Sequence, residues 1–313
     1  MLAAASVRRG IELTMQQERL SDWLNAVLGQ PVRRMEAVQG GCIHNAWALE
    51  LNDGTHLFAK SNRLALRPVL ESEAMGLEAL ADAASTAASA PLIPKPLICD
   101  AVDDWAVLVM SWLDLGQPIR GSVGDAWEQL GADLARLHRA SCRSNDQRYG
   151  WEHDNFIGSG HQRNRWCSSW CTFFARERLG LQLQQLQRPL PGAQELLAQL
   201  PDWLESHQPD ACLVHGDLWS GNAGLLRHGG GALFDPAVYR GDREVDLAMA
   251  QLFGGFPQAF FKGYQQEWPL PSGHAQRVEL YNLYHLLNHA NLFGGSYWQK
   301  SAVSIQNLLR CRR

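Results

Sequence analysis

One run of the chain, residues 213–237, constrains the fold more than any other part of the sequence. It reads as a buried strand, a loop that holds Asp217 and Asn222, and a short strand pair with Asp235 at its end. These three residues supply two carboxylates and one amide. Phosphoryl transfer from Mg·ATP needs a carboxylate that accepts a hydroxyl proton and oxygen ligands for the metal. We therefore predict Asp217 as the catalytic base, and Asn222 and Asp235 as Mg²⁺ ligands.

Neighbouring residues refine this prediction. His215 is expected to brace the loop through hydrogen bonds rather than to act as a base, and Asp246 is expected to anchor the same loop. Pro236 disfavours helical backbone at the residue before it, so Asp235 is predicted to be extended.

The same region argues against a regulated protein kinase. Gly216 stands where such kinases carry Arg in the loop. Only six residues separate Asp235 from Asp242, which leaves no room for a long activation segment. These features favour a constitutively active enzyme with small acceptors.

Composition excludes several other classes. The chain has 313 residues, 46% of them hydrophobic, and a net charge of −4, so a nucleic-acid partner is not expected. No apolar run approaches the roughly 18 residues that a membrane span requires. Seven cysteines without framework spacing indicate reduced thiols in the cytoplasm. Residues 1–14 read as a disordered lead-in, with Met15 as an alternative start.

Periodicity predicts an α+β, bilobed, protein-kinase-like fold. An amphipathic helix is expected over 16–29, a hairpin around Asp53-Gly54, a helix over 70–82 and a buried strand over 105–110. An N-terminal antiparallel-sheet lobe would span 15–110, a hinge 111–116, and a larger, mostly helical lobe 117–313. The helices expected in the second lobe are 124–140, 166–187, 193–206, 244–253, 257–266 and 275–293.

Lys60 is the candidate phosphate-binding residue of the first lobe. It ends the second hairpin strand, and Glu73 lies on the apolar stripe of the following helix. A carboxylate in such a position is costly unless it is paired, so we predict a Lys60–Glu73 ion pair, with Glu71 as the competing partner. Gly40 and Gly41 precede the hairpin, where glycine lets backbone N–H groups approach phosphates.

The predicted acceptor site combines aromatic rings with polar groups. Rings cover the C–H faces of a sugar, while amides and carboxylates bind its hydroxyls. Trp219 is favoured because it lies inside the catalytic loop, whereas Trp166 and Trp170 fit a pocket and a Trp-rich core equally well. The other predicted substrate residues are Trp151, Asp154, Asn155 and Gln162.

Several stretches together resemble the fructosamine kinase (ketosamine-3-kinase) family, in the aminoglycoside phosphotransferase-like branch of the protein-kinase-like fold. The resemblance spans about residues 16–300, and its most particular stretches are 150–158 and 239–249. It implies ATP-dependent phosphorylation of the sugar 3-hydroxyl of ketosamines, such as fructoselysine or ribuloselysine, which destabilises the adduct and removes the glycation. It also implies an adenine-binding hinge formed by Met110, Ser111, Trp112 and Leu113.

This chain departs from the family pattern in one place. The family often has Ser/Thr-Pro-Gln after the Asn-Phe-Ile-Gly motif, and this chain reads Ser159-Gly160-His161-Gln162. The difference concerns the geometry of the acceptor loop rather than the chemistry.

Two other functions stay open at this stage. One is a kinase for another hydroxylated amine, such as an aminoglycoside or a choline-like alcohol, and the other is an ATP-binding module without turnover. We expect a monomer. Cys42, in the glycine loop, would allow a mixed or intermolecular disulfide that blocks ATP.

Overall fold

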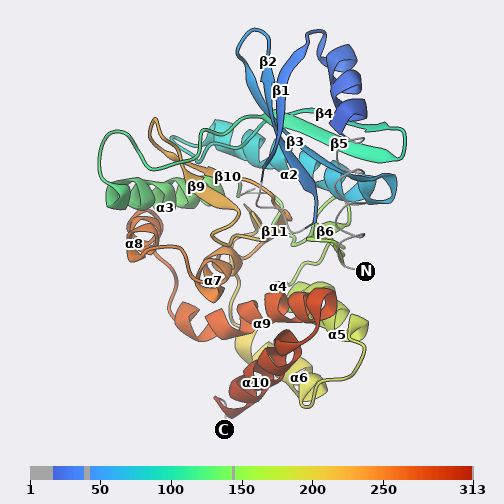
Figure 1. Cartoon of the computed structure of the whole chain (residues 1–313). Helices are drawn as coiled ribbons and strands as arrows, with labels where there is room; N and C mark the ends of the chain where they lie inside the picture. The colour runs from blue at the N-terminus through green and yellow to red at the C-terminus, as the bar shows by residue number, and fades with distance from the viewer. Residues whose placement is uncertain (1–16, 39–42, 143–144, 312–313) are drawn as a thin grey trace. The chain divides into compact units, whose positions relative to one another are not determined.

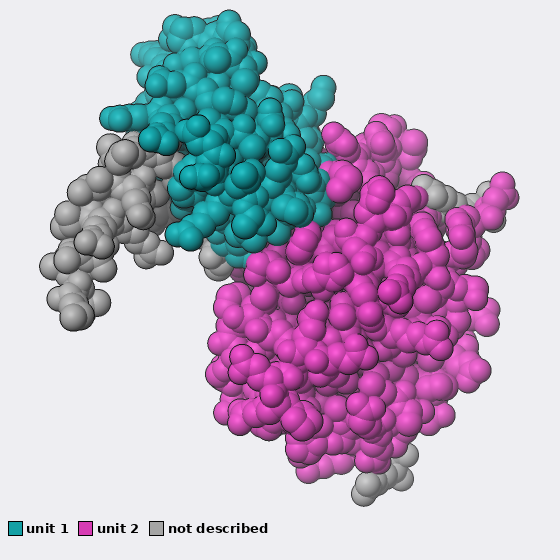
Figure 2. All heavy atoms as spheres, turned by 90° about the vertical axis from the view of Figure 1, so that its right-hand side faces the viewer, with its two compact units in different colours: residues 1–74, 94–113 teal, residues 75–93, 114–313 magenta. Residues whose placement is uncertain are grey.

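A computed structural model describes residues 17–38, 43–142 and 145–311. The chain divides into two compact units (Figure 2). The first unit holds residues 1–74 and 94–113, and the second holds 75–93 and 114–313. Residues 75–93 thus group with the second unit rather than with the first, where the sequence had placed them. The predicted lead-in, together with Gly40, Gly41 and Cys42, lies outside the described residues.

The first unit is built on a five-stranded antiparallel sheet with the order β1-β2-β3-β5-β4 (Figure 1). The expected hairpin is confirmed, because β2 and β3 pair across the turn at Asp53-Gly54. The two outer strands, β1 and β4, were not predicted. The strands are β1 Val32–Val38, β2 Asn45–Leu51, β3 His56–Arg63, β4 Pro96–Val102 and β5 Trp105–Ser111.

A helix over 17–28 covers this sheet and builds its core. Leu20 and Leu24 are buried against Trp47, Ala59 and Val109. Alternate residues of β2 are buried, as expected for a strand with one face on the core. The sheet that carries Lys60 on β3 therefore rests on a packed apolar layer.

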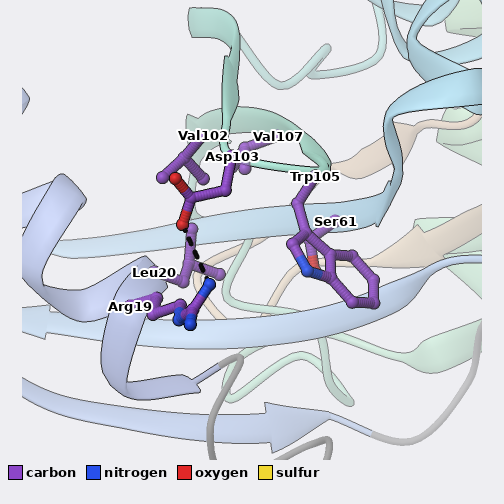
Figure 3. Close-up of a pocket in the computed structure, with 7 residues that line it drawn as sticks. All are labelled: Arg19, Leu20, Ser61, Val102, Asp103, Trp105 and Val107. Atoms are coloured by element: carbon purple, nitrogen blue, oxygen red, sulfur yellow. Dashed lines mark hydrogen bonds and ion pairs between the residues drawn. The ribbon is translucent and has the colours of Figure 1, made fainter.

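A small cavity lies beside this helix, and the ion pair between Arg19 and Asp103 spans 3.2 Å at its edge (Figure 3). Its volume is about 10 Å³, which is room for about one water molecule. Ser61 and Trp105 also line it. The cavity is therefore far too small for a nucleotide.

Helix α2, Arg67–Thr86, runs from the first unit into the second, which is mostly helical. Three short antiparallel strand pairs lie among its helices: β6 Asn155–Ile157 with β7 Gly160–Gln162, β8 Cys212–Val214 with β11 Tyr239–Gly241, and β9 Ala223–Leu225 with β10 Gly231–Leu233. The helices of this unit are α3 Val123–Ala140, α4 Trp170–Phe173, α5 Leu181–Gln185, α6 Ala193–Leu204, α7 Glu244–Leu252, α8 Gln258–Glu267, α9 His274–Phe293 and α10 Ser296–Arg310.

One predicted helix needs correction, and one helix was missed. The helix expected over 166–187 begins only at Trp170, and a π-helical segment, Phe174–Gly180, separates α4 from α5. A Cβ at position 180 would lie 2.7 Å from the carbonyl oxygen of Ala175, so this wide turn has room for glycine only. The terminal helix α10 was not predicted. The α+β class, with an N-terminal antiparallel sheet and a larger helical part, is confirmed.

No helix within the described part of the chain is long and apolar enough to span a membrane.

Candidate active site

The loop of residues 215–222, here called the Asp–Asn loop, leaves strand β8 and enters β9. His215 braces it as predicted. Its Nε2 donates to the carbonyl oxygen of Phe234 at 2.9 Å, and its Nδ1 accepts from the backbone N–H of Asp217 at 3.3 Å. Burial lowers the pKa of His215, so the ring is neutral in this tautomer. A ring held by both nitrogens positions the loop rather than moving protons.

Asp246 of α7 anchors the same loop, which confirms the structural role that the sequence predicted for it. Its two carboxylate oxygens accept from the backbone N–H groups of His215 at 2.7 Å and Gly216 at 2.8 Å. His138 of α3 lies 3.1 Å from the same carboxylate. Burial by itself would raise the pKa of Asp246, but the contacts with His138 and the backbone outweigh it and lower the pKa. Sequence reasoning missed His138, whose only signal was a histidine among the apolar positions of an amphipathic helix.

Gly216 has a backbone that only glycine adopts without strain, with φ of +80°. A Cβ there would lie 2.1 Å from the carbonyl oxygen of Ala237. An arginine, as regulated protein kinases carry here, would not fit this loop.

Asn222 joins the two predicted acidic residues. Its Nδ2 donates to the Asp217 carbonyl oxygen at 2.9 Å, to the Asp217 carboxylate at 3.2 Å and to the Asp235 carbonyl oxygen at 3.3 Å. With the nitrogen committed to these oxygens, the amide Oδ1 has no hydrogen bond to any described residue. The amide oxygen thus lies in a loop beside the carboxylate of Asp217 and the backbone of Asp235, and amide and carboxylate oxygens are ligands that Mg²⁺ prefers.

Burial, followed by the negative charge of Asp235, raises the pKa of Asp217 to about 7. Asp217 as a whole residue keeps some exposed surface. The negative charge of Asp235 disfavours the ionised form of Asp217, so bound cation charge would stabilise both carboxylates in their ionised forms. The residues present therefore fit a divalent metal.

Asp235 does not have the extended backbone that the sequence predicted. Its φ is +56°, in the left-handed region. Asp is among the few residue types that tolerate this region, and such a conformation costs about 1–3 kcal/mol. The rule for residues before proline describes local sterics, and here tertiary contacts on both sides of Asp235 override it. Phe234 N–H donates to the Asn222 carbonyl oxygen at 3.0 Å, and Ala237 N–H donates to the His215 carbonyl oxygen at 2.8 Å.

In the first unit, the predicted Lys60–Glu73 pair is confirmed. The Lys60 Nζ lies 2.6 Å from Glu73 Oε1, and the side chains are 8% and 9% exposed. The competing residue, Glu71, pairs instead with Arg67 at 2.7 Å on the surface of α2. The low exposure of both partners gives the ion pair one geometry, which fixes the position of the ammonium group.

The expected hinge residues are the last two residues of β5 and the two that follow it. Met110 is 2% exposed and belongs to the sheet. Ser111 pairs with Lys95 in both directions, since its N–H donates to the Lys95 carbonyl oxygen and its Oγ accepts from the Lys95 N–H, both at 2.9 Å. Trp112 is 37% exposed and lies beside the ring of Phe58. Leu113 ends the unit.

The predicted substrate residues differ in how much of their surface is exposed to solvent. Trp219 is half-buried within the Asp–Asn loop, where its ring covers Gly221. Asp154 is exposed and accepts from the backbone N–H of Asn164 at 2.8 Å. Trp151 packs partly against the core of the second unit. These three residues have surface that a ligand could contact.

Asn155 and Gln162 need correction, because they offer no such surface. They are 4% and 0% exposed, and both side-chain amides are hydrogen-bonded inside the second unit. Trp170, at 2% exposure, is a core residue. The segment in which His161 replaces the family proline still forms strand β7.

A second cluster of potential metal ligands, among the residues that the structure describes, consists of His207, Asp242 and Glu244. Its acidic groups are already committed. Arg277 donates to both carboxylate oxygens of Glu244, at 2.7 and 2.8 Å, and Tyr281 donates to Asp242 at 2.6 Å. A guanidinium in contact with the cluster opposes a cation, so this is a structural ion-pair cluster.

The sequence profile of the fructosamine kinase family matches residues 15–311. The chain belongs to the fructosamine kinase family. One relative, a probable ketoamine kinase of Synechocystis sp., is 40% identical over 298 residues, which cover 94% of this chain and 97% of the relative. Another, the chloroplastic protein-ribulosamine 3-kinase of Arabidopsis thaliana, is 34% identical over 300 residues, which cover 93% of this chain and 87% of the relative.

Solved structures agree with this family membership. The crystal structure of a putative fructosamine-3-kinase from Haemophilus somnus has a TM-score of 0.81 at 25% identity, and covers 94% of this chain and 97% of that one. A mutant aminoglycoside phosphotransferase APH(4)-Ia, in ternary complex with ADP and hygromycin B, has a TM-score of 0.57 at 14% identity, and covers 93% and 98%. The second likeness concerns the fold alone, and the fructosamine kinase family shares that fold.

Proposed function

We propose that this protein is an ATP-dependent kinase that phosphorylates the sugar 3-hydroxyl of ketosamines. The observation that carries the proposal is the pair of hydrogen bonds from the Asn222 amide to the Asp217 carboxylate and to the backbone carbonyl of Asp235, which holds these three residues together in the second unit. Membership of the fructosamine kinase family supports the ketosamine acceptor, as do relatives named as ketoamine and ribulosamine kinases.

In this proposal Asp217 binds and orients the attacking hydroxyl group and takes its proton. A carboxylate suffices for this task, because the transition state is loose and the hydroxyl need not be ionised beforehand. Asn222, through its free Oδ1, and Asp235 would hold Mg²⁺. The bound metal supplies positive charge that offsets the charge of the phosphates.

The first unit would contribute the nucleotide contacts. Glu73 holds Lys60 in one position, so that its ammonium group can bind the α- and β-phosphates of ATP. Gly40 and Gly41 would bring backbone N–H groups to the phosphates. Met110, Ser111, Trp112 and Leu113 would contact adenine.

The acceptor would bind through residues that keep exposed surface. The ring of Trp219 would cover a C–H face of the sugar, and Asp154 and Trp151 would contact the rest of the adduct. Since the 3-phosphorylated adduct is unstable, the reaction would remove glycation. The seven cysteines lack the spacing of a disulfide framework, which supports a reducing, cytoplasmic setting. We also propose that the protein is a monomer, and that an intermolecular disulfide at Cys42 would join two copies under oxidation.

The test is ADP release with fructoselysine, ribuloselysine and erythruloselysine side by side. An aminoglycoside and choline serve as acceptors for the alternative kinase, and Asp217→Ala serves as the inactive control. We expect acceptor-dependent ADP release with at least one ketosamine, and a phosphorus NMR signal coupled to the proton at C3. Release only with an aminoglycoside or choline would assign the alternative kinase. Absence of release with every acceptor, while ATP still binds, would favour a non-catalytic ATP-binding module.

A further inference from the structure

A fully buried polar network lies in the second unit, next to the segment that follows Asp235. We call it the amide network. Burying polar groups is costly unless each finds a partner, and a buried network whose members are paired is rigid. Its members, each at most 4% exposed, are Asn155, Gln162, Asn164, Arg178 and Tyr284.

The network is directed at two backbone carbonyl groups. Gln162 Nε2 donates to the carbonyl oxygen of Ala237 at 3.0 Å. Asn155 Nδ2 donates to the carbonyl oxygen of Val238 at 2.8 Å. These carbonyls lie two and three residues after Asp235. The side chains of Asn155 on β6 and Gln162 on β7 therefore hold the backbone just after the predicted metal ligand.

The other hydrogen bonds of the network fix the direction of these two amides. Tyr284 of α9 donates to Gln162 Oε1 at 2.6 Å, so the Gln162 nitrogen must face Ala237. Asn155 Oδ1 accepts from both Gln162 Nε2 and Asn164 Nδ2, each at 2.8 Å. A flipped amide would place an oxygen against a carbonyl oxygen and leave a buried donor without a partner.

Behind Asn164, a buried arginine closes the network. Arg178 Nη2 donates to Asn164 Oδ1 at 2.8 Å, and its guanidinium lies 3.8 Å from the ring centre of Tyr239. This arginine comes from the π-helical segment, whose wide turn lies in the helix that the sequence predicted as regular. The network therefore ties α9, β6, β7 and the π-helix to one short backbone segment.

That backbone segment also touches the Asp–Asn loop. Ala237 N–H donates to the carbonyl oxygen of His215 at 2.8 Å, and its own carbonyl oxygen lies against Gly216. The peptide of Ala237 is thus held by Gln162 on one side and by the loop on the other. Movement of Ala237 would shift Asp217 through the loop, and Asp235 through the chain.

We propose that Asn155, Gln162 and Tyr284 are positioning residues for phosphoryl transfer, which hold Ala237 and Val238 so that Asp235 and Asp217 keep their relative orientation. The left-handed backbone of Asp235 needs such support, because a strained conformation persists only where its surroundings determine it. The proposal rests on the proposed function for the chemistry that is positioned. It replaces the predicted sugar contact of Asn155 and Gln162.

The test compares two network variants with a matched control. Tyr284→Phe removes the hydroxyl that orients Gln162, and Gln162→Met removes the amide at similar volume. Tyr281→Phe is the control, because it also removes a buried hydroxyl from α9. That hydroxyl bonds to Asp242 and Trp170 and not to the amide network. Each full-length variant is measured for thermal unfolding, for kcat and acceptor KM, and for Mn²⁺ binding in the presence of ADP by electron paramagnetic resonance.

We expect the network variants to lower kcat and weaken Mn²⁺ binding by about tenfold to a hundredfold, the range found when groups behind metal ligands are removed. Acceptor KM should stay near its original value, and Tyr281→Phe should lose thermal stability while it keeps kcat and Mn²⁺ affinity. Raised acceptor KM with unchanged Mn²⁺ binding would instead make Gln162 a sugar-binding residue. Lost stability alone, matching the control, would also overturn the proposal.

The Mn²⁺ measurement separates this proposal from the proposed function, because it needs no acceptor. Wild-type protein that fails to bind Mn²⁺ with ADP would contradict the proposed kinase activity. Wild-type binding that the network variants leave unchanged would contradict only the positioning residues.

Discussion

The side-chain amide of Asn222 donates to the carboxylate of Asp217 over 3.2 Å, and this contact orders both residues within one loop. The amide nitrogen is thereby turned toward Asp217, and the amide oxygen is left for another ligand. One hydrogen bond thus separates two tasks, proton acceptance at Asp217 and cation binding at Asn222, that the proposed reaction needs side by side.

The first prediction concerns Asp217. Asp217→Asn keeps the shape of the side chain but removes the proton acceptor, so kcat should fall by about 10²- to 10⁴-fold. ATP affinity, measured by calorimetry, should change little, because the nucleotide contacts are assigned to other residues. Near-normal turnover of this variant would contradict Asp217 as the base.

The second prediction concerns the buried Lys60–Glu73 pair. Lys60→Met leaves the carboxylate of Glu73 buried without its partner, and removal of one partner costs about 3–5 kcal/mol of unfolding free energy. The double variant Lys60→Met/Glu73→Leu should recover most of that loss, since two apolar residues replace two charges. Denaturant unfolding measures both.

The recovery of stability in the double variant should not restore its affinity for ATP. The double variant should still have a strongly raised KM for ATP, because no ammonium group remains to bind phosphates. Recovery of both stability and ATP KM in the double variant would show that Lys60 serves the fold alone.

The third prediction concerns the pH dependence of stability. Burial, followed by repulsion from His289, lowers the pKa of His285 from 6.5 to about 3, although the negative charge of Asp246 acts in the opposite direction. Arg178 also disfavours the protonated ring. In the unfolded chain the ring of His285 takes up a proton below about pH 6.5. In the folded protein the same ring stays neutral down to about pH 3.

The contribution of neutral His285 is therefore complete above pH 6.5 and is lost as the pH falls from 6.5 toward 3. One proton changes the unfolding free energy by about 1.4 kcal/mol per pH unit. His285→Gln should reduce the slope of unfolding free energy against pH by up to this amount between pH 6 and 4. Parallel slopes for wild type and variant would contradict the buried, neutral histidine.

The fourth prediction compares two glycines with left-handed backbones. Gly216 and Gly229 have φ of +80° and +103°, but only a Cβ at position 216 meets another atom, 2.1 Å away. Gly229→Ala should cost about 1 kcal/mol from backbone strain alone. Gly216→Ala should cost more, and should also lower kcat, because the carbonyl of Ala237 must move. Equal losses in the two variants would show that the crowding at Gly216 is relieved without effect on the loop.

Much of the site followed from residues that are close in the chain. The Asp–Asn loop, the hairpin at Asp53-Gly54 and the bracing by His215 are local patterns, in which turn chemistry and side-chain spacing leave few conformations. The Lys60–Glu73 pair spans only 13 residues, and the cost of an unpaired buried carboxylate was enough to predict it.

Other features depend on residues far apart in the chain. Gln162 and Tyr284 are 122 positions apart, and no local pattern showed that their hydrogen bond would turn a predicted sugar ligand into a buried positioning residue. Asp235 takes a left-handed backbone against the local effect of Pro236, since its neighbours bond to Asn222 and His215. The sequence by itself determined which chemical groups are available for the proposed phosphoryl transfer. The tertiary structure decided which polar residues face outward and which are buried, because that depends on long-range contacts whose combined free energy exceeds local preference.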